Sequence, residues 1–132
     1  MKKLAAICLA LLCVWIPLFS VCAANTPEDT AEYLIQTVKE PKVSSVGGEW
    51  TIIGLARAQS AVPNGYFDGY YSRLCARLKE KNGVLHARKN TEYARVTLAL
   101  RAIGKNPESV GGYNLVKPLT DVEKTASQGL NG

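Results

Sequence analysis

The sequence has no charged residue between Leu4 and Thr26, although Lys2 and Lys3 stand directly before this stretch. A short positive start followed by an apolar run is typical of a secretory signal peptide. The run closes with Pro17 and with the small residues of Cys22-Ala23-Ala24, where a signal peptidase would cut. We therefore predict that residues 1–24 are a signal peptide, and that residues 25–132 form the folded part of a secreted or cell-surface protein.

Two alternatives for this first segment stay open. The apolar run is long enough to serve as an uncleaved membrane anchor. Cys22 could also carry a lipid, as in bacterial lipoproteins, but Val21 stands where a glycine or alanine would be expected before it. A membrane anchor is predicted only through this segment, and only if the segment is not cleaved.

Cysteine and histidine are scarce beyond the first segment. Of the 4 cysteines only Cys75 lies beyond residue 24, and the single histidine is His86. One thiol excludes an internal disulfide framework. A catalytic thiol would need His86 as its base, whereas the neighbours Leu74, Ala76 and Leu78 favour a small buried hydrophobe.

The charge balance excludes one class of partner. Beyond Lys3 the chain carries 14 Lys and Arg against 11 Asp and Glu, a net charge of +3. A basic stretch between Arg73 and Lys89 indicates either a solvated helix face or contact with an anionic polymer or lipid. It contains no aromatic residue for stacking on bases, so nucleic acid is not an expected partner.

No segment shows the alternating pattern of a β-strand, and the fold class predicted is all-α. Thr26-Pro27-Glu28-Asp29 begins a helix that ends before Pro41. Further helices are predicted over 48–61, with Trp50 and Ile53 inward, over 66–81, over 91–103, and briefly around 115–119. Apolar residues repeat every four positions in the third of these and every three to four in the fourth. The two sets are Tyr66, Tyr70, Leu74 and Leu78, and Tyr93, Val96, Leu100 and Ile103.

Two of these helices carry similar sequences. Residues 49–56 align without a gap with residues 92–99, an offset of 43 residues. This is the length of one helix pair in a helical array. A third copy would open beyond Gly132, so we expect the chain to be the first portion of a larger domain, with an uncovered flank after the second copy.

Several motifs follow one another between Val46 and Gly132. They are Gly47-Gly48-Glu49-Trp50, Thr91-Glu92-Tyr93-Ala94, Val110-Gly111-Gly112-Tyr113 and Gln128-Gly129-Leu130-Asn131-Gly132. Together they resemble exported bacterial proteins whose domain is similar to the prenyltransferase and squalene-cyclase repeat. The resemblance implies paired-helix repeats arranged as part of an α/α toroid, with the two aligned helices in the inner ring and the helix 66–81 in the outer ring.

The chain lacks the chemistry of the catalytic relatives. It has no Asp-x-Asp-Asp acid, as in class II terpene cyclases, and no Gln-x-x-x-Gly-x-Trp repeat. Cys75 and His86 alone cannot complete the zinc site of a protein prenyltransferase. No catalytic residue, metal ligand or cofactor is therefore predicted.

The resemblance implies a binding or interaction module for an unknown small molecule or cell-surface component. Toroids of this kind, as in cobalamin carriers, offer a concave end where aromatic residues stack on a ligand. The candidate ligand-binding residues are Glu49, Trp50, Glu92 and Tyr93. Their alternative roles are helix capping for the two acids and core packing for the two aromatics. The alternative function is an N-terminal fragment of a terpene cyclase or prenyltransferase-like enzyme whose catalytic residues lie in a missing C-terminal part.

Overall fold

The computed structural model describes residues 26–129, and the predicted signal peptide, residues 1–24, falls outside them. Within the described range the chain forms helices joined by loops, with no β-strand. The all-α prediction is confirmed for this part of the chain. The elements are α2 (Pro27–Thr37), α3 (Val46–Arg57), α4 (Tyr66–Glu80), α5 (Asn90–Ala102), the 3-10 helix η2 (Lys117–Thr120) and α6 (Val122–Gln128).

Helix α2 begins where the sequence predicts, because Thr26 caps it. The Thr26 hydroxyl oxygen accepts a hydrogen bond from the Asp29 N–H at 3.1 Å, and the Asp29 carboxylate accepts one from the Thr26 N–H at 2.9 Å. This capping box satisfies two backbone donors, and Pro27 needs no partner at the first helical position. The backbone hydrogen bond from Thr26, followed by the side-chain one, lowers the pKa of Asp29.

Helix α3 begins at Val46, two residues before the predicted start at position 48. Ser45 caps it, since its Oγ accepts a hydrogen bond from the Gly48 N–H at 3.0 Å. The helix ends at Arg57, ahead of the predicted Ala61, because Gln59 adopts a φ of 53°, in the left-handed region that a helix cannot continue through.

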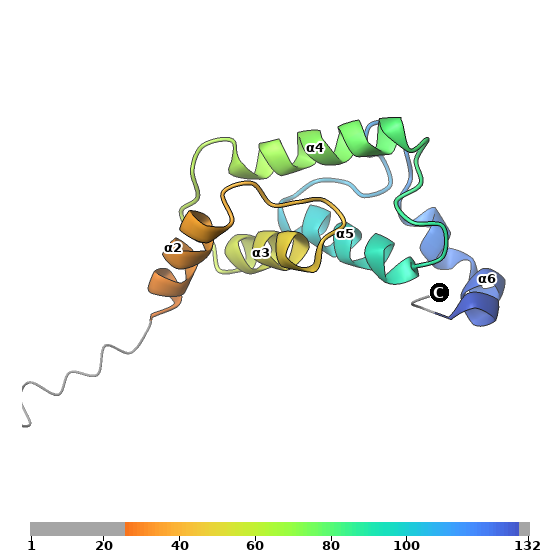
Figure 1. Ribbon diagram of the computed structural model, residues 1–132, viewed down its shortest axis with the longest axis horizontal. Helices are drawn as coiled ribbons and strands as arrows, with labels where there is room; N and C mark the ends of the chain where they lie inside the picture. The colour runs from red at the N-terminus through yellow and green to blue at the C-terminus, as the bar shows by residue number, and fades with distance from the viewer. Residues whose placement is uncertain (1–25, 130–132) are drawn as a thin grey trace, which may run out of the picture.

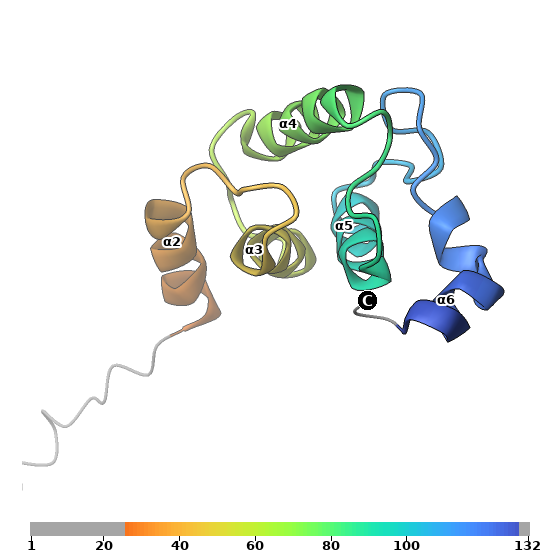
Figure 2. The ribbon, with the colours of Figure 1, turned by 45° about the vertical axis from the view of Figure 1, so that its right-hand side comes forward.

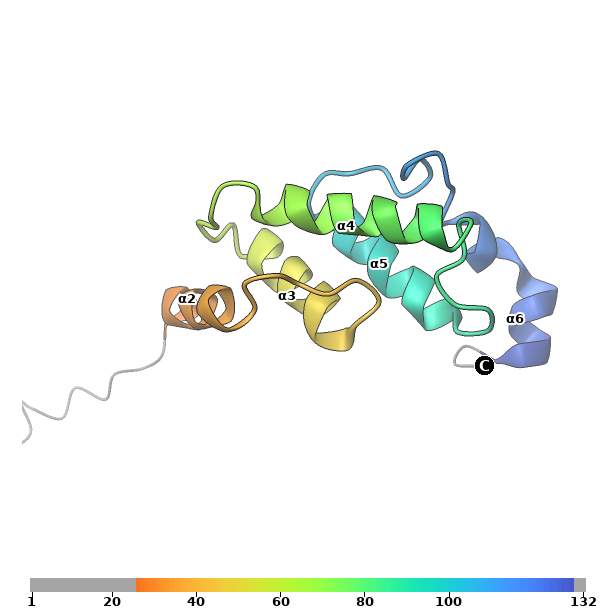
Figure 3. The same ribbon diagram turned by 45° about the horizontal axis from the view of Figure 1, so that its top comes forward.

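The three central helices form an up-and-down arrangement. Helices α3 and α5 run parallel and contact each other, while α4 runs antiparallel across both (Figures 1 and 3). Figure 2 shows α2 beside α3, and η2 and α6 beside α5. No helix within residues 26–129 covers the side of α3 and α5 that faces away from α4 (Figure 2).

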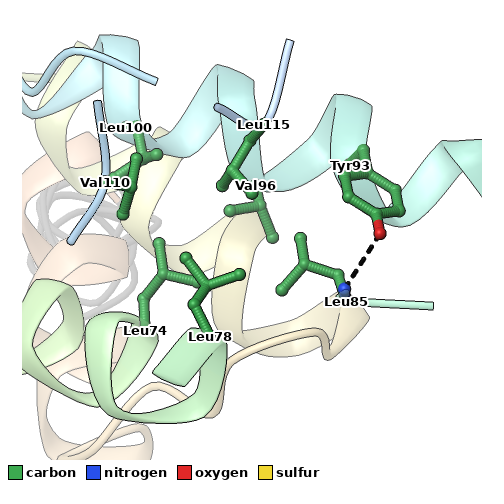
Figure 4. Close-up of a cluster of buried hydrophobic side chains, with 8 residues drawn as sticks. All are labelled: Leu74, Leu78, Leu85, Tyr93, Val96, Leu100, Val110 and Leu115. Carbon is green, nitrogen blue, oxygen red and sulfur yellow. Dashed lines mark hydrogen bonds between the residues drawn. The ribbon is translucent and has the colours of Figure 1, made fainter. Parts of the chain in front are cut away.

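The buried stripe of α4 is the one predicted from its spacing. Tyr66, Tyr70, Leu74 and Leu78 are all at most 8% exposed. The two tyrosines pack in a cluster with α2 and α3, whereas the two leucines pack in a second cluster with α5. Figure 4 shows the second cluster, which also contains residues of the loops at either end of α5. Helix α4 therefore joins the two halves of the core.

The far side of α5 is covered, contrary to the flank expected from the repeat. The predicted short helix near 115–119 appears as η2, which packs against α5. Leu115 just before it is fully buried in the same cluster as Val96. Beyond η2, α6 is tied to the start of α5, since the Asn90 amide donates a 2.6 Å hydrogen bond to the Thr125 hydroxyl. The expectation of an uncovered flank was wrong, because the sequence predicted the short helix near 115–119 but not its packing against α5.

Candidate functional site

The first candidate residue, Glu49, lies inside the molecule. Its side chain is fully buried, and its carboxylate accepts three hydrogen bonds. The donors are the Ser44 N–H at 2.8 Å and the Tyr70 hydroxyl at 2.9 Å, both to Oε1, and the Arg95 Nε at 3.1 Å to Oε2. One carboxylate therefore joins α3 to α4, to α5 and to the loop before α3.

These contacts compensate a buried charge. A carboxylate removed from water loses several kcal/mol of hydration unless a cation and further donors replace it. Arg95 supplies the cation, with 14% of its side chain exposed. Burial first, and then the charge and hydrogen bond of Glu49, raise the pKa of Tyr70 well above its ordinary value. The Tyr70 hydroxyl consequently stays protonated and donates.

Glu49 does not cap its own helix as predicted. Its carboxylate accepts a hydrogen bond from the Ser44 N–H, which lies before the capping residue Ser45 and outside α3. Glu92 occupies the matching position of α5 and is only partly buried. Its carboxylate makes no ion pair or side-chain hydrogen bond within residues 26–129. The two aligned acids therefore have different surroundings.

The two aligned aromatic residues also differ. Trp50 is 54% exposed, whereas Tyr93 is 5% exposed. The Tyr93 hydroxyl accepts a 3.0 Å hydrogen bond from the Leu85 N–H, and its ring packs in the core cluster (Figure 4). Core packing is confirmed for Tyr93. The inward orientation predicted for Trp50 was wrong, since α3 buries Ile52 and Leu55 instead.

The difference follows from how the two helices are rotated. In the alignment Ile53 matches Val96, yet the fully buried residues are Ile52 in α3 and Val96 in α5. The buried stripes are thus displaced by one position, which is a rotation of about 100° around a helix axis. The residues Glu49, Trp50, Glu92 and Tyr93 consequently do not form one surface.

Two of the four candidates remain accessible, in two places. Trp50 lies on the side of α3 opposite its buried residues, and Leu98 lies on the corresponding side of α5. Leu98 is 54% exposed and Val46, one turn before Trp50, is 63% exposed. We call these exposed sides of α3 and α5, which carry Val46, Trp50 and Leu98, the open face.

Glu92 lies in a cleft at the N-terminal ends of α3 and α5. This N-terminal cleft has a volume of about 400 Å³. Its lining residues are Ser44, Val46, Lys89, Thr91, Glu92 and Arg95. Sequence reasoning missed the cleft because its two sides are formed by segments more than forty positions apart, and only the packing of α3 on α5 brings them together.

A larger groove, of about 690 Å³, lies between α2 and the turn after α3. Its floor includes Ala31, Ile35 and Val62, and its charged residues are Glu28 and Glu32. The capping and spacing of α2 were visible in the sequence, but nothing in the pattern indicated that the turn 58–63 would lie across it. The charged side chains in the lining of this groove are therefore all acidic.

The remaining reactive side chains do not converge. Cys75 is a free, partly buried cysteine that packs at the edge of the α5 cluster. Burial and then the neighbouring Cys75 raise the pKa of Tyr71. His86 uses its Nδ1 to accept hydrogen bonds from the N–H groups of Arg88 and Lys89, at 3.1 and 3.0 Å. A structural role for Cys75 agrees with this packing.

Residues 26–129 contain no candidate metal site and no helix suited to span a membrane. No group of three or more His, Cys, Asp or Glu side chains there is placed to hold a metal ion. None of the helices in the same range has the length and apolar character needed to cross a membrane. The chain matches no family model, no curated protein and no solved structure with which it was compared.

Proposed function

We propose that the protein is an exported, non-catalytic helical-repeat module of the squalene-cyclase-like fold, which binds a small molecule or a cell-surface component. The observation that carries the proposal is the pairing of α3 with α5. These helices bear the aligned segments 49–56 and 92–99, and they lie parallel and in contact beneath the antiparallel α4. Parallel inner helices joined through an antiparallel outer helix are the repeating unit of an α/α toroid.

The open face supports a binding role. In a toroid the inner helices turn one side toward a central hollow, and on α3 and α5 that side would be the one facing away from α4. Exposed apolar side chains gathered on one surface are typical of contact sites. Trp50 and Leu98, both 54% exposed, provide such a surface on adjacent helices. Glu49 and Tyr93 would not touch the ligand. They would support binding by holding α3 and α5 in place through their buried hydrogen bonds.

Ligand binding can be tested by thermal denaturation of the purified chain with three probes: cobalamin, farnesyl diphosphate and a muropeptide from the cell wall. At least one probe should raise the melting temperature. Trp50→Ala should abolish that increase, whereas Tyr33→Ala, which removes an aromatic residue that is 66% exposed on α2, should leave it intact. No increase with any probe, or equal increases in both variants, would contradict binding at the open face.

The same samples distinguish binding from catalysis. Mass spectrometry after incubation should recover farnesyl diphosphate unchanged. Conversion to a cyclised or hydrolysed product would favour the enzyme alternative instead.

Export is tested separately, by expressing the whole chain in a bacterium and measuring the mass of the secreted product. A product beginning at Asn25 is expected. Retention of an intact chain in the membrane fraction would favour the anchor alternative.

A further inference from the structure

Arg95 is held in a fixed position at the N-terminal cleft. Its Nε donates to Glu49 Oε2 at 3.1 Å, and the Glu49 carboxylate is itself fixed by Ser44 and Tyr70. The two Nη groups of Arg95 donate to no acceptor within residues 26–129. A guanidinium anchored through Nε keeps its remaining N–H groups available for an oxygen ligand such as a carboxylate.

Ser44 also lines this cleft, and its hydroxyl group is not used in a hydrogen bond within the described residues. Its Oγ is buried and has no hydrogen-bond partner among the described residues. The backbone of Ser44 also has a φ of 57°, in the left-handed region that residues other than glycine and asparagine rarely adopt. A buried polar atom without a partner destabilises the fold, and a hydrogen bond to a ligand oxygen would remove that cost.

The charges in the cleft balance. Arg95 is paired with Glu49, which leaves Lys89 and Glu92 as the other charged residues of the lining. Glu92 makes no ion pair within the structure's described range, and Lys89 is exposed. A simple anion such as phosphate would be repelled by Glu92, whereas a molecule carrying both charges would meet a partner for each. The cleft thus favours a zwitterion.

We propose that the N-terminal cleft binds a free α-amino acid. Its carboxylate would meet the Arg95 Nη groups and the Ser44 hydroxyl, and its ammonium group would meet Glu92. The exposed Val46 side chain on the lining would contact an apolar side chain of the ligand. This inference extends the proposed binding function to a second site, the N-terminal cleft, and names the class of ligand for that site.

The test is a titration of the ¹⁵N-labelled chain with L-leucine, followed by amide chemical shifts. Saturable shifts are expected at Ser44, Lys89 and Glu92. Isocaproate lacks the ammonium group and isopentylamine lacks the carboxylate, so each should bind at least about tenfold more weakly, the equivalent of one charged hydrogen bond. Binding of isocaproate or of inorganic phosphate as tight as that of L-leucine would overturn the proposal.

Substitutions of Ser44 and Glu92, with Thr97→Val as a control, test the roles of these two residues in L-leucine binding. Ser44→Ala should weaken L-leucine binding about tenfold, while Thr97→Val, at another buried hydroxyl without a partner, should leave it unchanged. Glu92→Gln should weaken L-leucine but not isocaproate. Equal affinities in Ser44→Ala and Thr97→Val would contradict the assignment.

The outcomes also separate this inference from the proposed function. If L-leucine does not shift the cleft amides but cobalamin, farnesyl diphosphate or the muropeptide still raises the melting temperature, only the amino-acid site is refuted. If none of these compounds binds, both proposals are refuted.

Discussion

The Glu49 carboxylate on α3 and the Arg95 guanidinium on α5 form an ion pair at 3.1 Å between two helices that carry matching sequences. The pair does not join matching positions, because the residue of α3 aligned with Arg95 is Ile52, which is fully buried. A charged side chain in α5 thus replaces an apolar one in α3. The ion pair joins α3 to α5, and Arg95 also lines the N-terminal cleft.

Removing the buried acid should destabilise the protein far more than removing its aligned counterpart. Glu49→Ala leaves the Arg95 charge without its partner, which typically costs about 3–5 kcal/mol for a buried pair. Glu92→Ala removes a partly buried carboxylate with no ion pair in residues 26–129, and should change the free energy of unfolding by less than about 0.5 kcal/mol. Urea denaturation followed by circular dichroism measures both. Equal losses would show that the Glu49 contacts contribute little.

Tyr70 should make the protein less stable at alkaline pH. The pKa of Tyr70 is raised in the folded protein, by burial and then by the Glu49 charge, from its ordinary value of about 10. Its contribution to stability is therefore complete below about pH 9. Above about pH 10 the unfolded chain loses this proton and the folded chain keeps it, so the contribution falls by up to about 1.4 kcal/mol per pH unit.

The comparison that isolates this effect is Tyr70→Phe. At neutral pH the variant should lose about 1.5–3 kcal/mol with its hydrogen bond to a charged acceptor. The difference from the unmodified protein should shrink between about pH 9 and pH 11, because only the latter has the titrating hydroxyl. A constant difference for Tyr70→Phe would refute the assignment.

The sequence indicated those parts of the fold that depend on local patterns. The residues of the Thr26 capping box predict the start of a helix, and the four-residue spacing from Tyr66 to Leu78 predicts one buried helix face. The structure contains both. Helix α3 was different, because apolar residues occur on all sides of it. Its spacing was compatible with burial of either Trp50 or Ile52, and only contact with α4 decided for Ile52.

The candidate site was less predictable than the helices. Glu49 and Glu92 were visible as aligned acids, but burial of one and not the other depends on tertiary contacts. The donors to Glu49 lie in three separate segments, at Ser44, Tyr70 and Arg95. No spacing rule connects these residues. The internal alignment therefore pointed to α3 and α5. The rotation of each helix about its axis then decided which of the aligned side chains remain accessible.

Trp50 and Tyr93 should respond differently to the same conservative change. Tyr93→Phe leaves the buried Leu85 N–H without its acceptor, which should cost about 1–3 kcal/mol. Trp50→Phe, at a position 54% exposed, should cost less than about 0.5 kcal/mol. Denaturant titrations measure both costs. Iodide should also quench the fluorescence of Trp50 in a Trp15→Phe background, and a fully protected Trp50 would contradict its position on the open face.

Two glycines of α3 should give opposite results when changed to alanine. A Cβ at Gly48 would collide with the backbone carbonyl oxygen of Lys42 and with the Ser45 hydroxyl that caps the helix. A Cβ at Gly54 meets no atom within 4 Å. Alanine is favoured over glycine inside a helix by roughly 0.5–1 kcal/mol, so Gly54→Ala should stabilise the protein by about that amount.

Gly48→Ala should instead destabilise it, because overpacking against fixed backbone typically costs about 1–3 kcal/mol and the cap of α3 would be displaced. The loop that carries Lys42 also places the Ser44 N–H on Glu49, so a shift of this loop would weaken the buried network as well. Thermal melts of the two variants provide the comparison. If Gly48→Ala is as stable as Gly54→Ala, the loop before α3 is not packed against the helix as the structure describes.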